Sequence, residues 1–156
     1  MVRTARVFAA SMLVLAVACG GGGTKKPAAN KTPERTIVNV RLQDFAVLPE
    51  KASAAPGLIS FQPKNMGPKH EHEFVVVRTT LAPDKLPVEA NGSVDETSSK
   101  LKRIGEIEEI PVGSTGAKTF TLAAGSYVLF CNVVDKKGST TYVHYKLGMR
   151  SGFIVR

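Results

Sequence analysis

Short hydrophobic runs alternate with polar and turn-forming residues from position 36 to the end of the chain. Gly, Pro and Asn separate these runs, and several runs alternate apolar and polar positions, as half-buried strands do. Six runs predict strands: Thr36–Phe45, Gly57–Gln62, Glu73–Thr79, Lys118–Leu122, Gly125–Asn132 and Gly152–Arg156. Several short strands separated by turns are typical of an all-β sandwich or barrel.

The segment Leu81–Arg103 does not follow this strand pattern. It is long and polar, and it contains two prolines and an Asn91-Gly92 turn. Segments of this length are either functional or disordered, and Glu96–Arg103 is predicted as a short helix or an irregular excursion. Ile104–Ile110 then follows as a weaker candidate for a strand or a loop edge.

The first residues predict an export signal. Arg3 and Arg6 give a basic start, and Val7–Ala18 is apolar except for Ser11, which is short for a membrane span but suits a secretory signal. The run ends at Ala16-Val17-Ala18-Cys19, which resembles the lipobox of bacterial lipoproteins, although Ala16 stands where Leu is usual. The resemblance implies that Cys19 is lipidated. The alternative is an ordinary signal peptide with an incidental Cys19.

Composition divides the chain into three parts. The segment after Cys19 opens with four glycines and continues through Lys, Pro, Ala, Asn and Thr, so it predicts a flexible tether. We therefore expect a signal peptide at 1–18, a tether at 19–35 and one folded domain at 36–156. The protein is expected outside the cytoplasm, held by lipid at a bacterial membrane.

The composition also excludes some classes of function. The net charge is +8, but the basic residues are scattered or lie in the tether, so we expect no binding to nucleic acid. No pair of catalytic carboxylates, nucleophile elbow or phosphate-binding glycine loop is found in the sequence. The sequence therefore predicts a protein that is not an enzyme.

The cysteine count draws attention to Cys131. The chain has two Cys, so if Cys19 is lipidated or removed, Cys131 has no partner for an intramolecular disulfide. An unpaired Cys in an exported protein is either a buried, inert hydrophobic residue or a functional thiol. Cys131 ends an apolar strand, and His144 and Met149 follow it before the final strand.

These residues match the needs of a type 1 copper site. Such a site takes two imidazoles and one thiolate in a plane, with a weak axial Met. His72, at the start of an apolar strand far back in the chain, would supply the second imidazole. His70 lies two residues earlier, and on a strand both rings would face the same side, so periodicity does not separate them.

Two segments resemble the cupredoxins, the superfamily of plastocyanin and azurin. The strand into Cys131 and the His144-to-Met149 spacing resemble its C-terminal ligand loop, and 65–74 resembles the stretch around its first copper His. The resemblance covers about residues 36–156. It implies a Greek-key β-sandwich of about seven or eight strands and one copper held by His72, Cys131, His144 and Met149.

The resemblance also implies a function, which is transfer of single electrons between Cu(I) and Cu(II). We expect a monomer, a redox protein as partner, and an edge of His144 near the surface where that partner docks. His72 is preferred to His70 because it directly precedes the apolar strand, and His70 is expected to lie exposed in a loop. Capture or delivery of copper without redox turnover is the alternative function.

Two positions depart from the family pattern. Twelve residues separate Cys131 from His144, where small cupredoxins have only a few, and the insertion 135–141 is expected to form an outward hairpin or to alter the site. Glu73 stands where many members carry an Asn that ties the ligand loops together. A zinc site with one open position and a metal-free accessory domain are further alternatives.

Overall fold

The computed structural model describes residues 34–156, and the predicted all-β sandwich is confirmed there. The predicted signal peptide, the lipidation site Cys19 and the tether up to residue 33 lie outside the described residues. No helix in the described part of the chain is long and apolar enough to cross a membrane.

Eleven strands and one short helix are present among residues 34–156. They are β1 (Arg35–Gln43), β2 (Ala46–Pro49), β3 (Ser53–Ala54), β4 (Gly57–Asn65), β5 (His72–Arg78), β6 (Lys102–Ile110), β7 (Lys118–Leu122), β8 (Gly125–Phe130), β9 (Val134–Lys137), β10 (Thr140–Val143), α1 (His144–Leu147) and β11 (Arg150–Val155).

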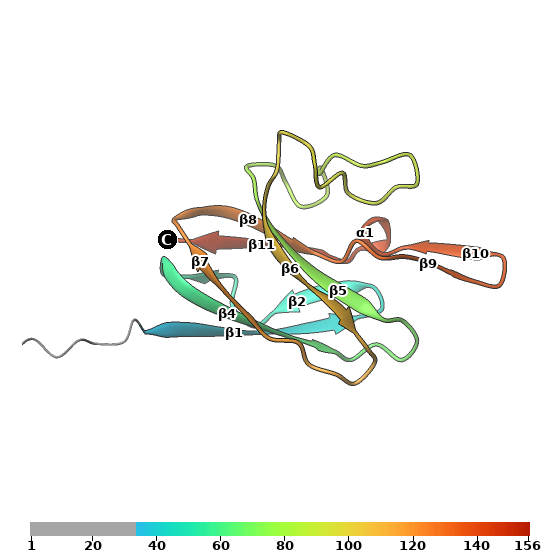
Figure 1. Ribbon diagram of the computed structural model, residues 1–156, viewed down its shortest axis with the longest axis horizontal. Helices are drawn as coiled ribbons and strands as arrows, with labels where there is room; N and C mark the ends of the chain where they lie inside the picture. The colour runs from blue at the N-terminus through green and yellow to red at the C-terminus, as the bar shows by residue number, and fades with distance from the viewer. Residues whose placement is uncertain (1–33) are drawn as a thin grey trace, which may run out of the picture. The chain divides into compact units, whose positions relative to one another are not determined.

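The main strands form two sheets that pack as the layers of a sandwich (Figure 1). One sheet has the order β2-β1-β4-β7 and the other has the order β3-β11-β8-β5-β6. Each predicted strand lies in one of them, and the weaker candidate Ile104–Ile110 is part of β6. The count exceeds the prediction because two short strands, β2 and β3, and the hairpin β9–β10 are added.

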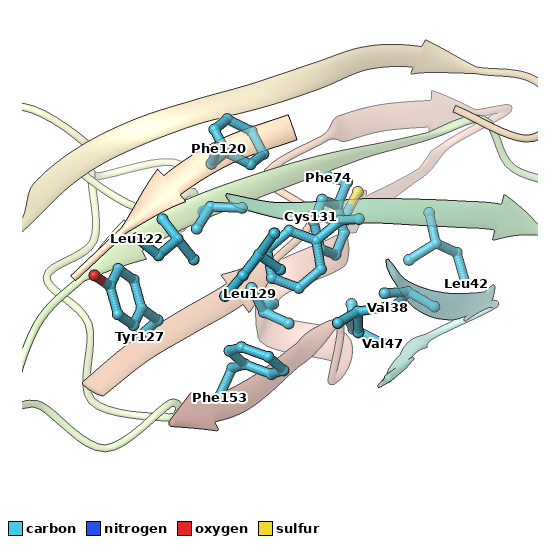
Figure 2. Close-up of a cluster of buried hydrophobic side chains, with 14 of the residues drawn as sticks. Val38, Leu42, Val47, Phe74, Phe120, Leu122, Tyr127, Leu129, Cys131 and Phe153 are labelled. Atoms are coloured by element: carbon cyan, nitrogen blue, oxygen red, sulfur yellow. The ribbon is translucent and has the colours of Figure 1, made fainter. Parts of the chain in front are cut away.

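The interior of the sandwich is built from the inward-facing residues of both sheets. On β1 the buried positions alternate along the strand, and Val38, Val40 and Leu42 face the interior. Aromatic rings fill the centre, where the ring of Phe61 contacts those of Phe74 and Phe153. Figure 2 shows Cys131 among these buried side chains. The side chain of Cys131, the predicted functional thiol, is therefore part of the hydrophobic core.

The segment between β5 and β6 covers the outer face of the five-stranded sheet. Val75 and Val77 of β5 point to that face, where Leu86, Val94 and Leu101 bury them. A strand buried on both faces has a continuous apolar sequence, which explains the Phe-Val-Val-Val run of β5. Of the two predictions for residues 96–103, the irregular excursion is correct.

Candidate metal centre

Three predicted site residues meet where the two sheets end. His72 is the first residue of β5, Cys131 directly follows β8, and His144 begins α1. The sheet makes β5 and β8 neighbours, with Val75 opposite Phe130, so His72 is brought beside Cys131 despite a separation of 59 residues. The hairpin β9–β10 extends from this end and returns the chain to His144 (Figure 1).

The three side chains present one atom each to a common point. The Nδ1 atoms of His72 and His144 are 3.2 Å apart, and the Cys131 sulfur lies 3.3 Å from Nδ1 of His144 and 3.9 Å from Nδ1 of His72. All three residues have no exposed surface. The structure thus brings together two imidazole nitrogens and one sulfur in a site closed to solvent.

Burial sets the charge of this group. It lowers the pKa of His72 to about 4, with the neighbouring His144 as a second cause, and it also lowers the pKa of His144. Burial raises the pKa of the Cys131 thiol to about 12. Without a metal at pH 7, both rings are therefore neutral and the thiol keeps its proton.

Met149 lies in the same buried cluster as Cys131, and the backbone holds the two segments together. The Cys131 N–H donates to the Met149 carbonyl at 3.1 Å, and the Met149 N–H donates to the His144 carbonyl at 3.0 Å. Gly148 makes the turn between His144 and Met149 with φ of 125°, which other residues rarely adopt. A Cβ there would lie 2.9 Å from the Phe45 carbonyl, so the turn requires glycine.

Glu73 ties the strand of His72 to the segment after Cys131. Its carboxylate accepts the Asn132 N–H at 2.7 Å, and its own N–H points at the Cys131 sulfur at 3.4 Å. The contact that the family pattern assigns to an Asn is thus made by a carboxylate here. The Asn132 side chain in turn accepts the Val94 N–H and donates to the Val94 carbonyl, which joins the covering segment to the site.

Two expectations about the histidines are wrong. His70 is only 4% exposed, because its ring packs between Phe45 and Tyr142 and its Nδ1 contacts Asp135 at 2.9 Å. His144 has no exposed edge, since Phe45, His70 and Asp135 surround its ring. The long Cys-to-His insertion contributes to both, because its hairpin carries Asp135, which lies beside both rings, and Tyr142, whose ring contacts that of His70.

Two carboxylates that sequence reasoning missed lie behind the rings. The His72 Nε2 atom is 3.3 Å from Asp44 Oδ1, and the His144 Nε2 atom is 3.5 Å from Asp135 Oδ1. Asp44 follows β1 and Asp135 lies in the insertion. The placement of one acidic residue in the insertion was a usable signal for Asp135, whereas nothing in the spacing pointed to Asp44.

The donor set fits a soft or intermediate metal ion. A ring whose Nε2 carries its proton beside a carboxylate presents a lone pair at Nδ1. Two such lone pairs and the Cys131 sulfur then face one another, and the thiol proton is the only proton among these three atoms. Thiolate and imidazole together suit copper or zinc, while hard ions prefer oxygen. His70, Asp135 and His144 also form a close group, in which the His144 Nε2 atom lies 3.5 Å from Asp135 Oδ1.

The chain is a small β-sandwich with a buried group of one sulfur and two imidazole nitrogens, and comparisons with known proteins identify its fold. No protein-family model matches the chain, and no curated protein matches it. Solved structures of blue copper proteins do match. The likeness shows that the chain has the cupredoxin fold, as predicted from the sequence.

The similar structures include two auracyanins and a rusticyanin. Reduced auracyanin from Roseiflexus castenholzii has a TM-score of 0.51 and 20% identity, covering 78% of this chain and 97% of its own. Auracyanin A, a "blue" copper protein from Chloroflexus aurantiacus, has a TM-score of 0.50 and 19% identity, with coverage of 79% and 100%. The copper protein rusticyanin has a TM-score of 0.53 and 17% identity, covering 78% of each chain.

Proposed function

We propose that this chain is a type 1 copper protein that carries single electrons between redox partners. The observation that carries the proposal is the buried group of two Nδ1 atoms and one sulfur at the end of a cupredoxin fold. Copper held there would supply one-electron chemistry between Cu(I) and Cu(II).

The proposed ligands are His72, Cys131, His144 and Met149. The first three are supported by the distances among their Nδ1 and sulfur atoms. Met149 is supported by its burial in the cluster of Cys131 and by its backbone link to that residue. As in other type 1 sites, a weak thioether ligand would tune the reduction potential.

The protein's own residues make the proposed site rigid and dry. His72 is held by a central strand, and Cys131 is held by backbone and by Glu73 on either side. The rings of Phe45 and Tyr142 stack at 5.9 Å and pack with His70 over His144, which excludes water. A ligand frame held in place by these contacts would keep the reorganisation on electron transfer small, as an electron carrier requires.

We further propose an extracytoplasmic location with lipid at Cys19 and a tether at 19–35 before the domain at 36–156. Support comes from the apolar run that ends at Cys19 and from the glycine-rich stretch after it. The chain is proposed to act as a monomer whose partner is another redox protein.

A redox titration separates the electron carrier from a protein that only captures or delivers copper. We expect the copper-loaded protein to titrate reversibly with one electron and to keep its metal through gel filtration in both oxidation states. His70→Ala, which removes none of the four proposed ligands, should still titrate with one electron. Loss of copper on reduction, or binding of Cu(I) alone, would instead support copper handling.

A further inference from the structure

Each of the two buried imidazoles of the proposed site has a carboxylate behind it. Four atoms are involved: Nε2 of His72 and Oδ1 of Asp44, and Nε2 of His144 and Oδ1 of Asp135. All four are buried, and none forms a hydrogen bond within the described residues. Burying a polar atom without a hydrogen-bond partner costs free energy. Here each imidazole nitrogen has a carboxylate oxygen within 3.5 Å.

The first pair is enclosed by backbone. Asp44 is 13% exposed, and Gly67 packs against its contact with His72. A Cβ at position 67 would lie 2.1 Å from Asp44 Oδ1 and 3.2 Å from His72 Nε2, so only glycine leaves room for the pair. The Gly67 N–H donates to the buried side chain of Asn65 at 3.0 Å, which fixes the loop there. The Asp44–His72 contact is therefore built into the packing.

The second pair is held by a third residue. His70 Nδ1 contacts Oδ2 of Asp135 at 2.9 Å, which leaves Oδ1 directed at His144. Asp135 is thus a carboxylate held behind the His144 ring by the buried side chain of His70.

We propose that Asp44 and Asp135 are positioning residues for the metal site, each accepting the Nε2 proton of one imidazole and so directing its Nδ1 lone pair toward Cys131. A carboxylate behind a ligating imidazole fixes the tautomer and raises the donor strength of the ring. The inference rests on the proposed function, but its first test needs no copper.

The two carboxylates also bias the oxidation state. Negative charge and stronger nitrogen donors stabilise Cu(II) more than Cu(I), because the higher charge interacts more strongly with both. Loss of such an outer partner costs about 10- to 100-fold in metal affinity. If a tenfold loss fell on Cu(II) alone, the reduction potential would rise by about 59 mV.

The first experiment measures the ring tautomers of the metal-free protein by ¹⁵N NMR. We expect the Nε2–H form for both His72 and His144. Asp44→Asn and Asp135→Asn keep the side-chain shape, but the amide can also donate to an unprotonated Nε2. Each variant should therefore populate the Nδ1–H form of its own histidine and leave the other unchanged. Nδ1–H rings in the unsubstituted protein would overturn the proposal.

The second experiment measures Cu(II) and Cu(I) affinities and the reduction potential of the same variants. We expect Cu(II) binding about 10- to 100-fold weaker, a smaller change for Cu(I), and a higher potential. Asp84→Asn is the matched control, since it makes the same charge change at an exposed residue that pairs with Lys85. Unfolding curves confirm that each variant is folded.

The outcomes separate the two claims. If the tautomers switch as expected but no copper binds, the positioning role holds and the proposed function fails. If copper binds and the potentials of Asp44→Asn and Asp135→Asn equal that of Asp84→Asn, the positioning role fails and the proposed function stands.

Discussion

Glu73 is a half-buried carboxylate that accepts the backbone N–H of Asn132, the residue directly after Cys131. Burial raises its pKa to about 7, although the hydrogen bond from Asn132 works in the opposite direction. Glu73 therefore links the strand of His72 to the segment after Cys131, and its contribution to the free energy of unfolding depends on pH.

Glu73→Gln should change how the stability of the metal-free protein depends on pH. The folded state holds the Glu73 proton more tightly than the unfolded state, so its contribution falls as pH rises from about 4.5 to about 7 and then levels off. We expect the Gln variant to gain about 1–3 kcal/mol relative to the original protein across this window.

Urea unfolding at several pH values measures this difference. The difference curve isolates Glu73, because the buried histidines titrate equally in both proteins. Glu71→Gln, two residues earlier and exposed, removes the same charge at the surface and is the control. A difference for Glu73→Gln that does not change with pH would show that Glu73 does not take up a proton on folding.

A second prediction at the residue scale concerns the number of protons that Cys131 releases when a metal binds. Since the thiol has a pKa of about 12 and both rings are neutral at pH 7, a bound metal must displace one proton, from sulfur. Calorimetry in buffers of different ionisation enthalpy should show one proton released for each copper bound at pH 7. Release of two protons would mean that one of the rings is also protonated in the metal-free protein, which contradicts its lowered pKa.

At the scale of elements, the segment between β5 and β6 shows what sequence patterning missed. Its polar composition concealed three buried anchors, Leu86, Val94 and Leu101, spaced too irregularly to show a helix or strand period. The continuous apolar run of β5 was the one indication in the sequence that another segment packs on the outer face of this strand, because such a run is typical of a strand buried on both faces. For the insertion 135–141 the sequence left two possibilities, an outward hairpin or an altered site. The contacts of Asp135 with His70 and His144 could not be predicted, because His70 lies far away in the sequence.

Val94→Ala tests whether this segment is a packed part of the domain. Val94 is 3% exposed, whereas its bridge partner Val88 is 44% exposed. Removing two buried methyl groups should lower the free energy of unfolding by about 2 kcal/mol. Val88→Ala removes the same atoms from the surface and should change it by less than about 0.5 kcal/mol. Equal effects in denaturant unfolding would mean that the segment does not pack as described.

At the scale of the whole molecule, the fold was predictable because strand patterns and turn residues repeat along the chain. Cys131, His144 and Met149 were predictable as a set because they lie in one loop before the last strand. His72 was preferred to His70 from the sequence because it directly precedes the apolar strand, and the structure places His72 Nδ1 3.9 Å from the Cys131 sulfur and turns His70 toward Asp135. Asp44 was not predictable, since only the fold brings it behind His72.

The central claim is that Cys131 and two histidines hold copper as a type 1 site, and the visible spectrum on addition of Cu(II) tests it most directly. We predict one copper for each chain and an intense visible absorption from the Cu(II)–thiolate bond. The absorption should be lost in Cys131→Ala and kept in His70→Ala. A protein that stays colourless with Cu(II), or one that keeps its colour without the Cys131 sulfur, would contradict the claim.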